Sequence, residues 1–253
     1  MKNKPIILVA GEPNSIFLEI FFKVFSNIKT QSPLILICSK KILLSQMKYF
    51  RYKFRIKTLN TKHINTYKFN NKTLNIIDVK YKQKKIFEKI SIKSNSYIKK
   101  SFLIAIKLIK SGLTKKLING PISKKHFLNK KFPGITEYIS YKFKTSNTAM
   151  LIFNKNLSVS PVTTHLSISE ISKKISKKLI IQNIKLIRKF YLKNFALNPK
   201  IAITGLNPHC ESRTNEERKI IMPVINSLTG TDFKVFGPFS ADTIFLSENR
   251  KKY

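Results

Sequence analysis

Short apolar runs alternate along the chain with longer segments in which apolar residues recur every three or four positions. Runs of about four to eight apolar, often β-branched residues are typical of buried strands, whereas the longer spacing is typical of helices with one apolar face. This alternation predicts βαβ units around a mostly parallel sheet, and therefore an α/β fold. Strands are expected at 5–10, 34–38, 74–79, 117–118, 149–153, 159–163, 200–205 and 233–236.

Helices are expected between these strands, and local signals mark where two of them begin or end. Gly112 follows the apolar pattern of 96–111, and a glycine at that position is typical of a helix end. Ser167 and Glu170 are spaced as a capping box, which predicts that a helix begins there. In the first helix, the residues expected on one apolar face are Ile16, Phe17, Ile20, Phe21, Val24 and Phe25. Further helices are expected at 41–47, 178–195 and 217–228, and an irregular or edge segment is expected at 49–72.

Four polar clusters directly follow predicted strands. They are 11–14, 119–124, 163–165 and 205–209. Ligands of parallel α/β sheets bind at the carboxyl ends of the strands, so these clusters are expected to meet at one cleft. Glu12 in the first cluster and Asn207 in the last are candidate substrate contacts.

His165 and His209 each follow a predicted buried strand, where an imidazole would point into that cleft. Imidazole is a common metal ligand, although a single histidine in such a place is more often structural. A catalytic metal site usually has three protein ligands and an open position, and His63 and His126 lie in polar contexts that do not mark them as ligands. Asp242 is a candidate carboxylate partner, and a helix N-cap or turn is the alternative interpretation.

Lys124 and Thr136 are candidates for holding an anionic substrate group. Lysine offers a point charge and threonine a hydroxyl, but a single lysine carries little information in so basic a chain. The sequence has no GxGxxG fingerprint after the first strand and no P-loop, so the usual nucleotide-binding signals are missing. It has no nucleophile elbow either, which argues against a Ser-His-Asp hydrolase.

The formal net charge of +37 points at first to an anionic partner. Basic residues are spread along the 253 residues as pairs such as Lys99-Lys100 and Lys173-Lys174, with no basic tail. Lysine, isoleucine, asparagine and phenylalanine are favoured by A/T-rich codons, so codon bias accounts for much of the charge, and nucleic acid is not the expected partner. A preference for polyanions stays the open alternative, because positive charge binds phosphate at low salt.

Cys38 and Cys210 are the two cysteines, and neither lies in a CxxC or Cys/His cluster. A disulfide framework is therefore not expected, which agrees with a reducing compartment. The first apolar run is too short for a signal peptide, and no stretch reaches the roughly 18 apolar residues that a membrane-spanning helix needs. We expect a cytoplasmic protein with no membrane partner.

Six motifs occur in the order and approximate spacing of one enzyme family. They are Gly11-Glu12-Pro13, Gly120-Pro121-Ile122-Ser123-Lys124, Pro133-Gly134-Ile135-Thr136-Glu137, Val162-Thr163-Thr164-His165, Gly205-Leu206-Asn207-Pro208-His209 and Gly237-Pro238-Phe239-Ser240-Ala241-Asp242-Thr243. With them, the chain resembles the 4-hydroxythreonine-4-phosphate dehydrogenases over its whole length. One such motif would be weak, whereas six in the same order are very specific.

The resemblance implies a two-domain α/β enzyme related to the isocitrate and isopropylmalate dehydrogenases and acting as a homodimer. Its lobes are expected at 1–120 and 121–253. Members use NAD to oxidise the secondary alcohol of 4-phosphohydroxy-L-threonine in pyridoxal 5'-phosphate biosynthesis, and the resulting keto acid loses CO₂.

The resemblance also implies a divalent metal, with Zn, Mg or Co as candidates, that three histidines hold against the substrate. His165 and His209 resemble two of these ligands, and Thr136 resembles a phosphate contact. Lys124 and Asp242 resemble cleft residues and are the catalytic candidates. The residues that would bind NAD are not identified.

Two departures from the family pattern bear on activity. Ile135 stands where the family usually has a histidine that contacts the substrate, so substrate affinity or identity is expected to differ. The resemblance also stops before the family's last quarter, which supplies the third metal histidine and segments that help hold substrate and NAD. We therefore expect either a fragment or a natural truncation at Tyr253. The alternative function is a non-catalytic remnant or phosphate-ligand-binding protein of the same fold.

Overall fold

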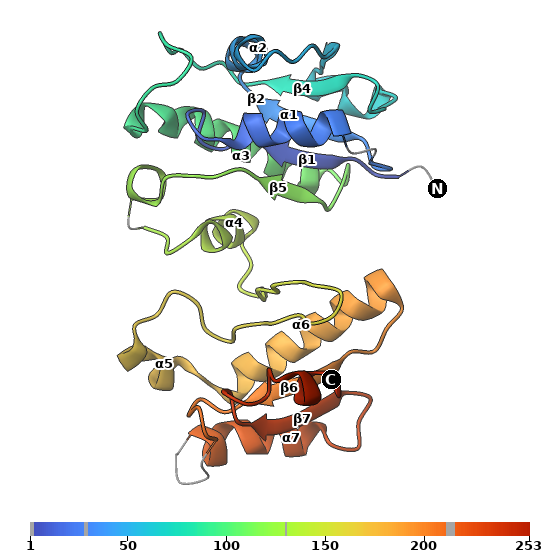
Figure 1. The fold of residues 1–253 in the computed structure, drawn as a ribbon, viewed down its shortest axis with the longest axis vertical. Coiled ribbons are helices and arrows are strands. Elements are labelled where there is room, and N and C mark those ends of the chain that lie inside the picture. The colour runs from blue at the N-terminus through green and yellow to red at the C-terminus, as the bar shows by residue number, and fades with distance from the viewer. Residues whose placement is uncertain (1–2, 28–29, 130, 211–215) are drawn as a thin grey trace. The chain divides into compact units, whose positions relative to one another are not determined.

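The computed structural model describes residues 3–27, 30–129, 131–210 and 216–253. It divides into two compact units, Met1–Phe143 and Lys144–Tyr253 (Figure 1). Leu128 and Tyr138 belong to a core cluster of the first unit, so residues 121–143 pack with that unit, although the sequence placed the start of the second lobe at residue 121. None of the described helices is long and apolar enough to cross a membrane.

The first unit contains a five-stranded sheet in which every neighbouring pair is parallel. Its strands are β1 (Ile6–Val9), β2 (Leu34–Cys38), β3 (Ile56–Thr58), β4 (Leu74–Asp78) and β5 (Leu117–Asn119). They lie in the order β3-β4-β2-β1-β5. The apolar runs that predicted β1, β2 and β4 are almost fully buried, as expected for parallel strands covered on both faces. The predicted α/β class with a mostly parallel sheet is confirmed.

Helices cover both faces of this sheet. α1 (Phe17–Asn27) and α2 (Lys40–Tyr49) share a core cluster with one set of strand residues, and α3 (Asn95–Lys110) shares another cluster with the alternate set. Leu36 lies in the first cluster, and its neighbour Ile37 lies in the second. Successive strand residues point to opposite faces, so this alternation places one helical layer on each side.

The apolar face predicted for α1 is partly wrong. Ile16 and Ile20 are exposed at 63% and 48%, whereas Leu18, Phe21 and Phe22 are buried. Apolar residues occur on more than one side of this helix, so spacing alone does not determine which side packs against the sheet.

Shorter elements complete the first unit. They are η1 (Thr61–Thr66), η2 (Ile92–Ser94), η3 (Lys124–Leu128) and α4 (Ile135–Phe143). β3 and η1 fall within 49–72, and β3 forms an edge of the sheet, in agreement with the expected edge segment. Gly112 follows α3 with a φ of +82°, which confirms the predicted helix end.

The second unit is built on a parallel pair of strands, β6 (Lys200–Thr204) and β7 (Lys234–Phe239). Its core cluster joins the long helix α6 (Lys177–Phe195), the helix α7 (Met222–Leu228) and β7. The remaining elements are α5 (Ile168–Lys174), η4 (Glu217–Ile221) and α8 (Ser247–Arg250). The predicted capping box at the start of α5 is present.

The strands expected at 149–153 and 159–163 do not form. One isolated antiparallel bridge joins Ile152 and Val159, with backbone hydrogen bonds of 2.8 and 3.0 Å. Ile152 is 62% exposed. Apolar alternation shows which side chains can be buried, but a ladder also requires a neighbouring strand that offers its backbone groups, and the sequence pattern does not identify that neighbour.

Candidate functional site

The first two polar clusters lie side by side in the first unit, at the carboxyl ends of β1 and β5. Gly120 N donates to Val9 O at 2.8 Å. Glu12 N donates to Pro121 O at 2.8 Å. Gly11 has a φ of +74°, and a Cβ atom there would lie 2.3 Å from Pro121 O. The two loops approach so closely that only glycine fits at this position.

The Glu12 side chain is 2% exposed, and its carboxyl oxygens are used within the first unit. Ser94 Oγ donates to Glu12 Oε2 at 2.7 Å, and Asn14 N donates to Oε1 at 3.4 Å. These contacts tie the loop after β1 to η2. The sequence did not indicate a role for Ser94, because it lies 82 residues away from Glu12. A substrate contact of Glu12 stays a prediction.

Lys124 and Thr136 lie at the starts of two helical segments of the first unit. Lys124 is exposed and begins η3, whose N-cap hydroxyl on Ser123 accepts from a backbone N–H. Thr136 is half-buried in the first turn of α4. Its neighbour Ile135 packs against the core of the unit, so this apolar side chain has a packing role. Anion binding by Lys124 and Thr136 stays a prediction.

In the second unit, the loop after β6 is held against the loop after β7. Gly205 N donates to Phe239 O at 2.9 Å. Pro208 O accepts from Ala241 N at 2.8 Å and from Ser240 Oγ at 2.9 Å. Because β6 and β7 are parallel, their carboxyl ends lie at the same edge, and two motifs distant in the sequence meet there.

His209 and Asp242 are brought into contact by these two loops. His209 Nδ1 lies 3.2 Å from Asp242 Oδ2, and the two side chains are 71% and 45% exposed. The hydroxyl of Ser240, hydrogen-bonded to Asp242, is the main cause that lowers the pKa of this carboxyl group, and His209 lowers it further. The carboxylate is therefore ionised at neutral pH and available to accept the Nδ1–H of the imidazole.

The buried carboxyl group of Glu217 is hydrogen-bonded to the backbone of the loop after β6. Glu217 is 1% exposed, and its Oε1 accepts from Leu206 N at 2.7 Å and from Asn207 N at 2.8 Å. Asn207 Oδ1 in turn accepts from His209 N at 3.1 Å. Sequence reasoning missed this role, because an acidic residue where a helix begins is usually interpreted as a partner of the helix dipole.

His165 lies in the third polar cluster, with a left-handed backbone at φ 57° and an exposed side chain. Within the described parts of the chain, no three His, Cys, Asp or Glu side chains gather closely enough to hold a metal ion. The structure thus places His209 beside Asp242, but it does not assemble a set of three metal ligands. The ligand roles of His165 and His209 stay predictions.

The contact between His209 and Asp242 nevertheless has the chemistry found around bound metals. A metal-ligating imidazole usually donates its second ring N–H to a carboxylate, which fixes the orientation of the ring. Asp242 occupies the Nδ1 side of His209, so Nε2 is the nitrogen available to a metal. Imidazole suits zinc and other transition metals better than magnesium. The residues therefore fit one metal ligand and its orienting partner.

Residues 29–253 match one protein-family model, which is described as "Pyridoxal phosphate biosynthetic protein PdxA". A 4-hydroxythreonine-4-phosphate dehydrogenase of Sulfurihydrogenibium sp. (strain YO3AOP1) is 36% identical over 146 residues, which cover 54% of this chain and 45% of the relative. The enzyme of the same name from Aquifex aeolicus is 26% identical over 261 residues, covering 98% of this chain and 78% of the relative.

Solved structures show the same fold. A chain from Salmonella typhimurium superposes with a TM-score of 0.85 at 22% identity, covering 99% of this chain and 79% of that one. The 4-hydroxythreonine-4-phosphate dehydrogenase of Klebsiella pneumoniae gives 0.82 at 22% identity, covering 99% and 78%. At this identity the likeness concerns the fold, and it agrees with the α/β architecture described above.

Proposed function

Because the chain belongs to the family of the pyridoxal phosphate biosynthetic protein PdxA, we propose that it oxidises 4-phosphohydroxy-L-threonine with NAD and a divalent metal, in pyridoxal phosphate biosynthesis. The relatives from Sulfurihydrogenibium and Aquifex aeolicus are named for a dehydrogenase of this kind. The aligned part is 45% of the first relative and 78% of the second. We include in the proposal the homodimer that the sequence resemblance implies.

The contact between His209 Nδ1 and Asp242 Oδ2, at 3.2 Å, is the observation that carries this proposal. A bound metal would lower the pKa of the substrate hydroxyl and favour loss of hydride from its carbon. Asp242 holds the imidazole of His209 in the tautomer whose Nε2 is a free ligand.

Further hydrogen bonds of Ser240 and Glu217 would keep His209 in place without reorganisation during the reaction. The Ser240 hydroxyl lies within hydrogen-bond distance of both the Asp242 carboxylate and Pro208 O, and these two acceptors, one on each loop, share its single proton. Glu217 fixes the backbone just before His209. Groups held in advance are more effective than groups that must be ordered when substrate binds.

For the substrate phosphate, the proposal assigns Thr136 and Lys124 of the first unit. A hydroxyl can donate one hydrogen bond and an ammonium group supplies positive charge. Ile135 cannot hydrogen-bond phosphate, so the phosphate contacts must differ from those of relatives that have a histidine there.

Zinc titration of the 253-residue protein by calorimetry tests the metal part of the proposal, and NADH formation is measured on the same samples. His209→Ala should abolish both. Asp242→Asn should weaken zinc binding about 10–100-fold, as expected when the orienting partner of a ligand is lost. His63→Ala is the matched control, because His63 lies outside the proposed site. Equal zinc affinity in the wild type, His209→Ala and His63→Ala would refute the assignment.

A further inference from the structure

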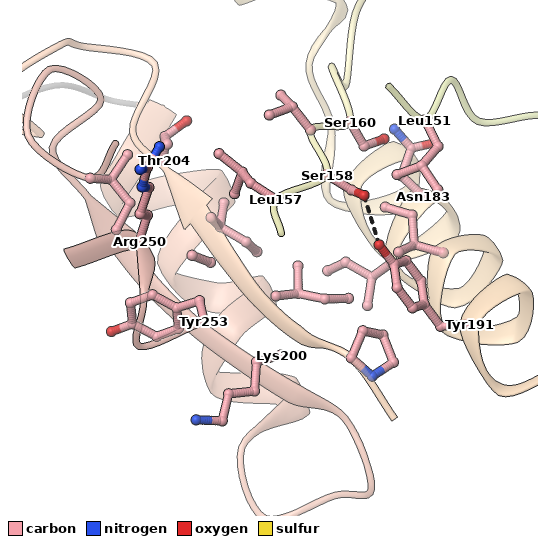
Figure 2. A pocket seen from close by; sticks show the side chains of 18 of the residues that line it. Leu151, Leu157, Ser158, Ser160, Asn183, Tyr191, Lys200, Thr204, Arg250 and Tyr253 are labelled. Carbon is pink, nitrogen blue, oxygen red and sulfur yellow. Dashed lines mark hydrogen bonds between the residues drawn. The ribbon is translucent and has the colours of Figure 1, made fainter. Parts of the chain in front are cut away.

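A cavity of about 360 Å³ lies beside β6 in the second unit (Figure 2). Its walls come mainly from β6, from α6, from the segment 154–160 and from C-terminal residues that include Ile244 and Arg250. In the described two-stranded sheet, β6 is paired with β7 alone, and all five of its residues line the cavity. Small-molecule sites are typically about 300–1,000 Å³ and mostly apolar. The cavity therefore has the size of a site for one small ligand.

Apolar side chains form most of the lining. Ile184 on α6 is buried in the core cluster of the second unit, and Ile201 and Ile203 on β6 pack against that cluster. Leu157 and Val159 line the cavity from the segment 154–160. An apolar ligand body would remove this surface from water, and the gain grows with the apolar area that is covered.

Every charged side chain in the lining is cationic. These residues are Lys155, Lys200 and Arg250, and the lining, all of which is described, includes no aspartate or glutamate. Lys200 Nζ donates to Lys252 O at 2.9 Å. Arg250 has no ion-pair partner among the described residues. The charges favour an anionic head group and disfavour a cationic one.

Asn183 adds a polar group to the apolar wall formed by α6. It is 5% exposed and lines the cavity, and its side chain has no hydrogen bond to any residue that the structure describes. Because Asn183 lines the cavity without such a bond, its amide offers a donor and an acceptor to a ligand there. Figure 2 shows Asn183 on the same side of the cavity as the hydrogen bond of 2.8 Å from Tyr191 Oη to Ser158 Oγ, with Arg250 on the other side.

We propose that this cavity binds a small amphipathic carboxylate with a polar group at its far end. The carboxylate lies at Arg250, the apolar chain lies along β6, and a hydroxyl group at the other end meets the amide of Asn183. Arg250 and Asn183 lie outside the loops that carry His209 and Asp242, although Thr204 and Ile244 of the lining adjoin these loops, so the site is tested by ligand binding and not by NADH formation.

Calorimetric titration of the wild-type protein with three ligands of equal chain length tests the ligand class. Octanoate should bind at one site. 8-Hydroxyoctanoate should bind about 2–13-fold more tightly, because it adds one net hydrogen bond. Heptyltrimethylammonium, whose apolar chain has the same length as that of octanoate and whose charge is opposite, should not bind. Similar affinities for the three ligands, or no octanoate binding at millimolar concentration, would overturn the proposal.

Two variants test the placement of the ligand. Asn183→Leu should keep octanoate binding and lose the advantage of 8-hydroxyoctanoate. Arg250→Gln should weaken both carboxylates about threefold, the effect of an exposed ion pair. Lys189→Gln removes the same charge from the exposed part of α6 outside the lining, and it should leave both affinities unchanged. Equal losses of carboxylate affinity in Arg250→Gln and Lys189→Gln would show that the ligands are attracted to the basic protein in general, and would overturn the proposed site. This comparison does not depend on whether Asn183→Leu folds.

Discussion

Replacing Glu217 by alanine should release the loop that carries His209. The substitution removes the acceptor of two backbone hydrogen bonds, from Leu206 N at 2.7 Å and from Asn207 N at 2.8 Å. One net hydrogen bond contributes about 0.5–1.5 kcal/mol, and about 1.5–3 kcal/mol when one partner is charged. Because Glu217 is 1% exposed, water does not readily replace its carboxyl group. We expect local opening of the loop to become easier by about 2–4 kcal/mol.

Hydrogen–deuterium exchange of the peptide that contains Leu206 and Asn207 measures this loss directly. A change of about 2–4 kcal/mol in the free energy of local opening makes exchange about 30-fold to several hundred-fold faster. Glu217→Gln keeps an oxygen at the Oε1 position and nearly the same shape, so exchange should accelerate less than about tenfold. Peptides from β2, in the first unit, should exchange at the wild-type rate in both variants.

Unchanged exchange of the two amides in a folded Glu217→Ala protein would refute this reasoning. In that case the carboxyl group would not be what holds the loop, and Asn207 and His209 would depend on the contacts to Pro208 instead. Circular dichroism of each variant establishes that the comparison is made between folded proteins.

Three other predictions concern the fold and its local signals. Gly11→Ala should lower the free energy of unfolding by more than the strain of a positive φ alone, which is about 1–2 kcal/mol, because its Cβ atom would lie 2.3 Å from a backbone oxygen. Gly112→Ala is the control, because its Cβ atom would meet no atom within 4 Å and only the strain of positive φ applies. Equal losses of stability in urea denaturation would contradict the packing argument. Phe102→Ala should cost about 3–5 kcal/mol, since the ring is 0% exposed, and a thermal melt close to that of the wild type would contradict its place in the core. Ser167→Ala should raise the pKa of Glu170 toward its usual value, because the Ser167 hydroxyl is the main cause that lowers it. A lowered pKa contributes stability above the unfolded pKa that is lost as the pH falls through the folded pKa, so the start of α5 should fray in acid; an unchanged carboxyl titration by NMR in the variant would count against the capping box.

The parts of the fold that the sequence predicted well are those with one strong local cause. β2 and β4 are apolar runs buried on both faces, and Gly112 ends α3 through its own backbone freedom. The strand expected at 159–163 depended on a partner strand that no local pattern specifies. In the same way, α1 offered more than one apolar side, and only packing against the sheet determined that Phe22 would be buried.

The candidate site was predictable to the level of loops. The sequence placed His209 at the carboxyl end of a strand and named Asp242 as a candidate carboxylate partner, and the contact between the two side chains agrees with that pairing. The supporting contacts of Glu217 and Ser94 were not predictable, because each reaches a loop through a side chain whose local sequence suggests an ordinary helix start. Such contacts depend on tertiary geometry and leave no periodic signal.

NADH formation from 4-phosphohydroxy-L-threonine tests the proposed dehydrogenase most directly. The purified 253-residue protein is mixed with NAD, the substrate and either Zn²⁺ or Mg²⁺, and NADH absorbance is followed before and after a chelator is added. We predict NADH formation that stops with the chelator, returns when the metal is restored, and is absent in His209→Ala. A folded protein that binds the substrate but forms no NADH with either metal would contradict the dehydrogenase proposal and favour a non-catalytic phosphate-ligand-binding protein of the same fold.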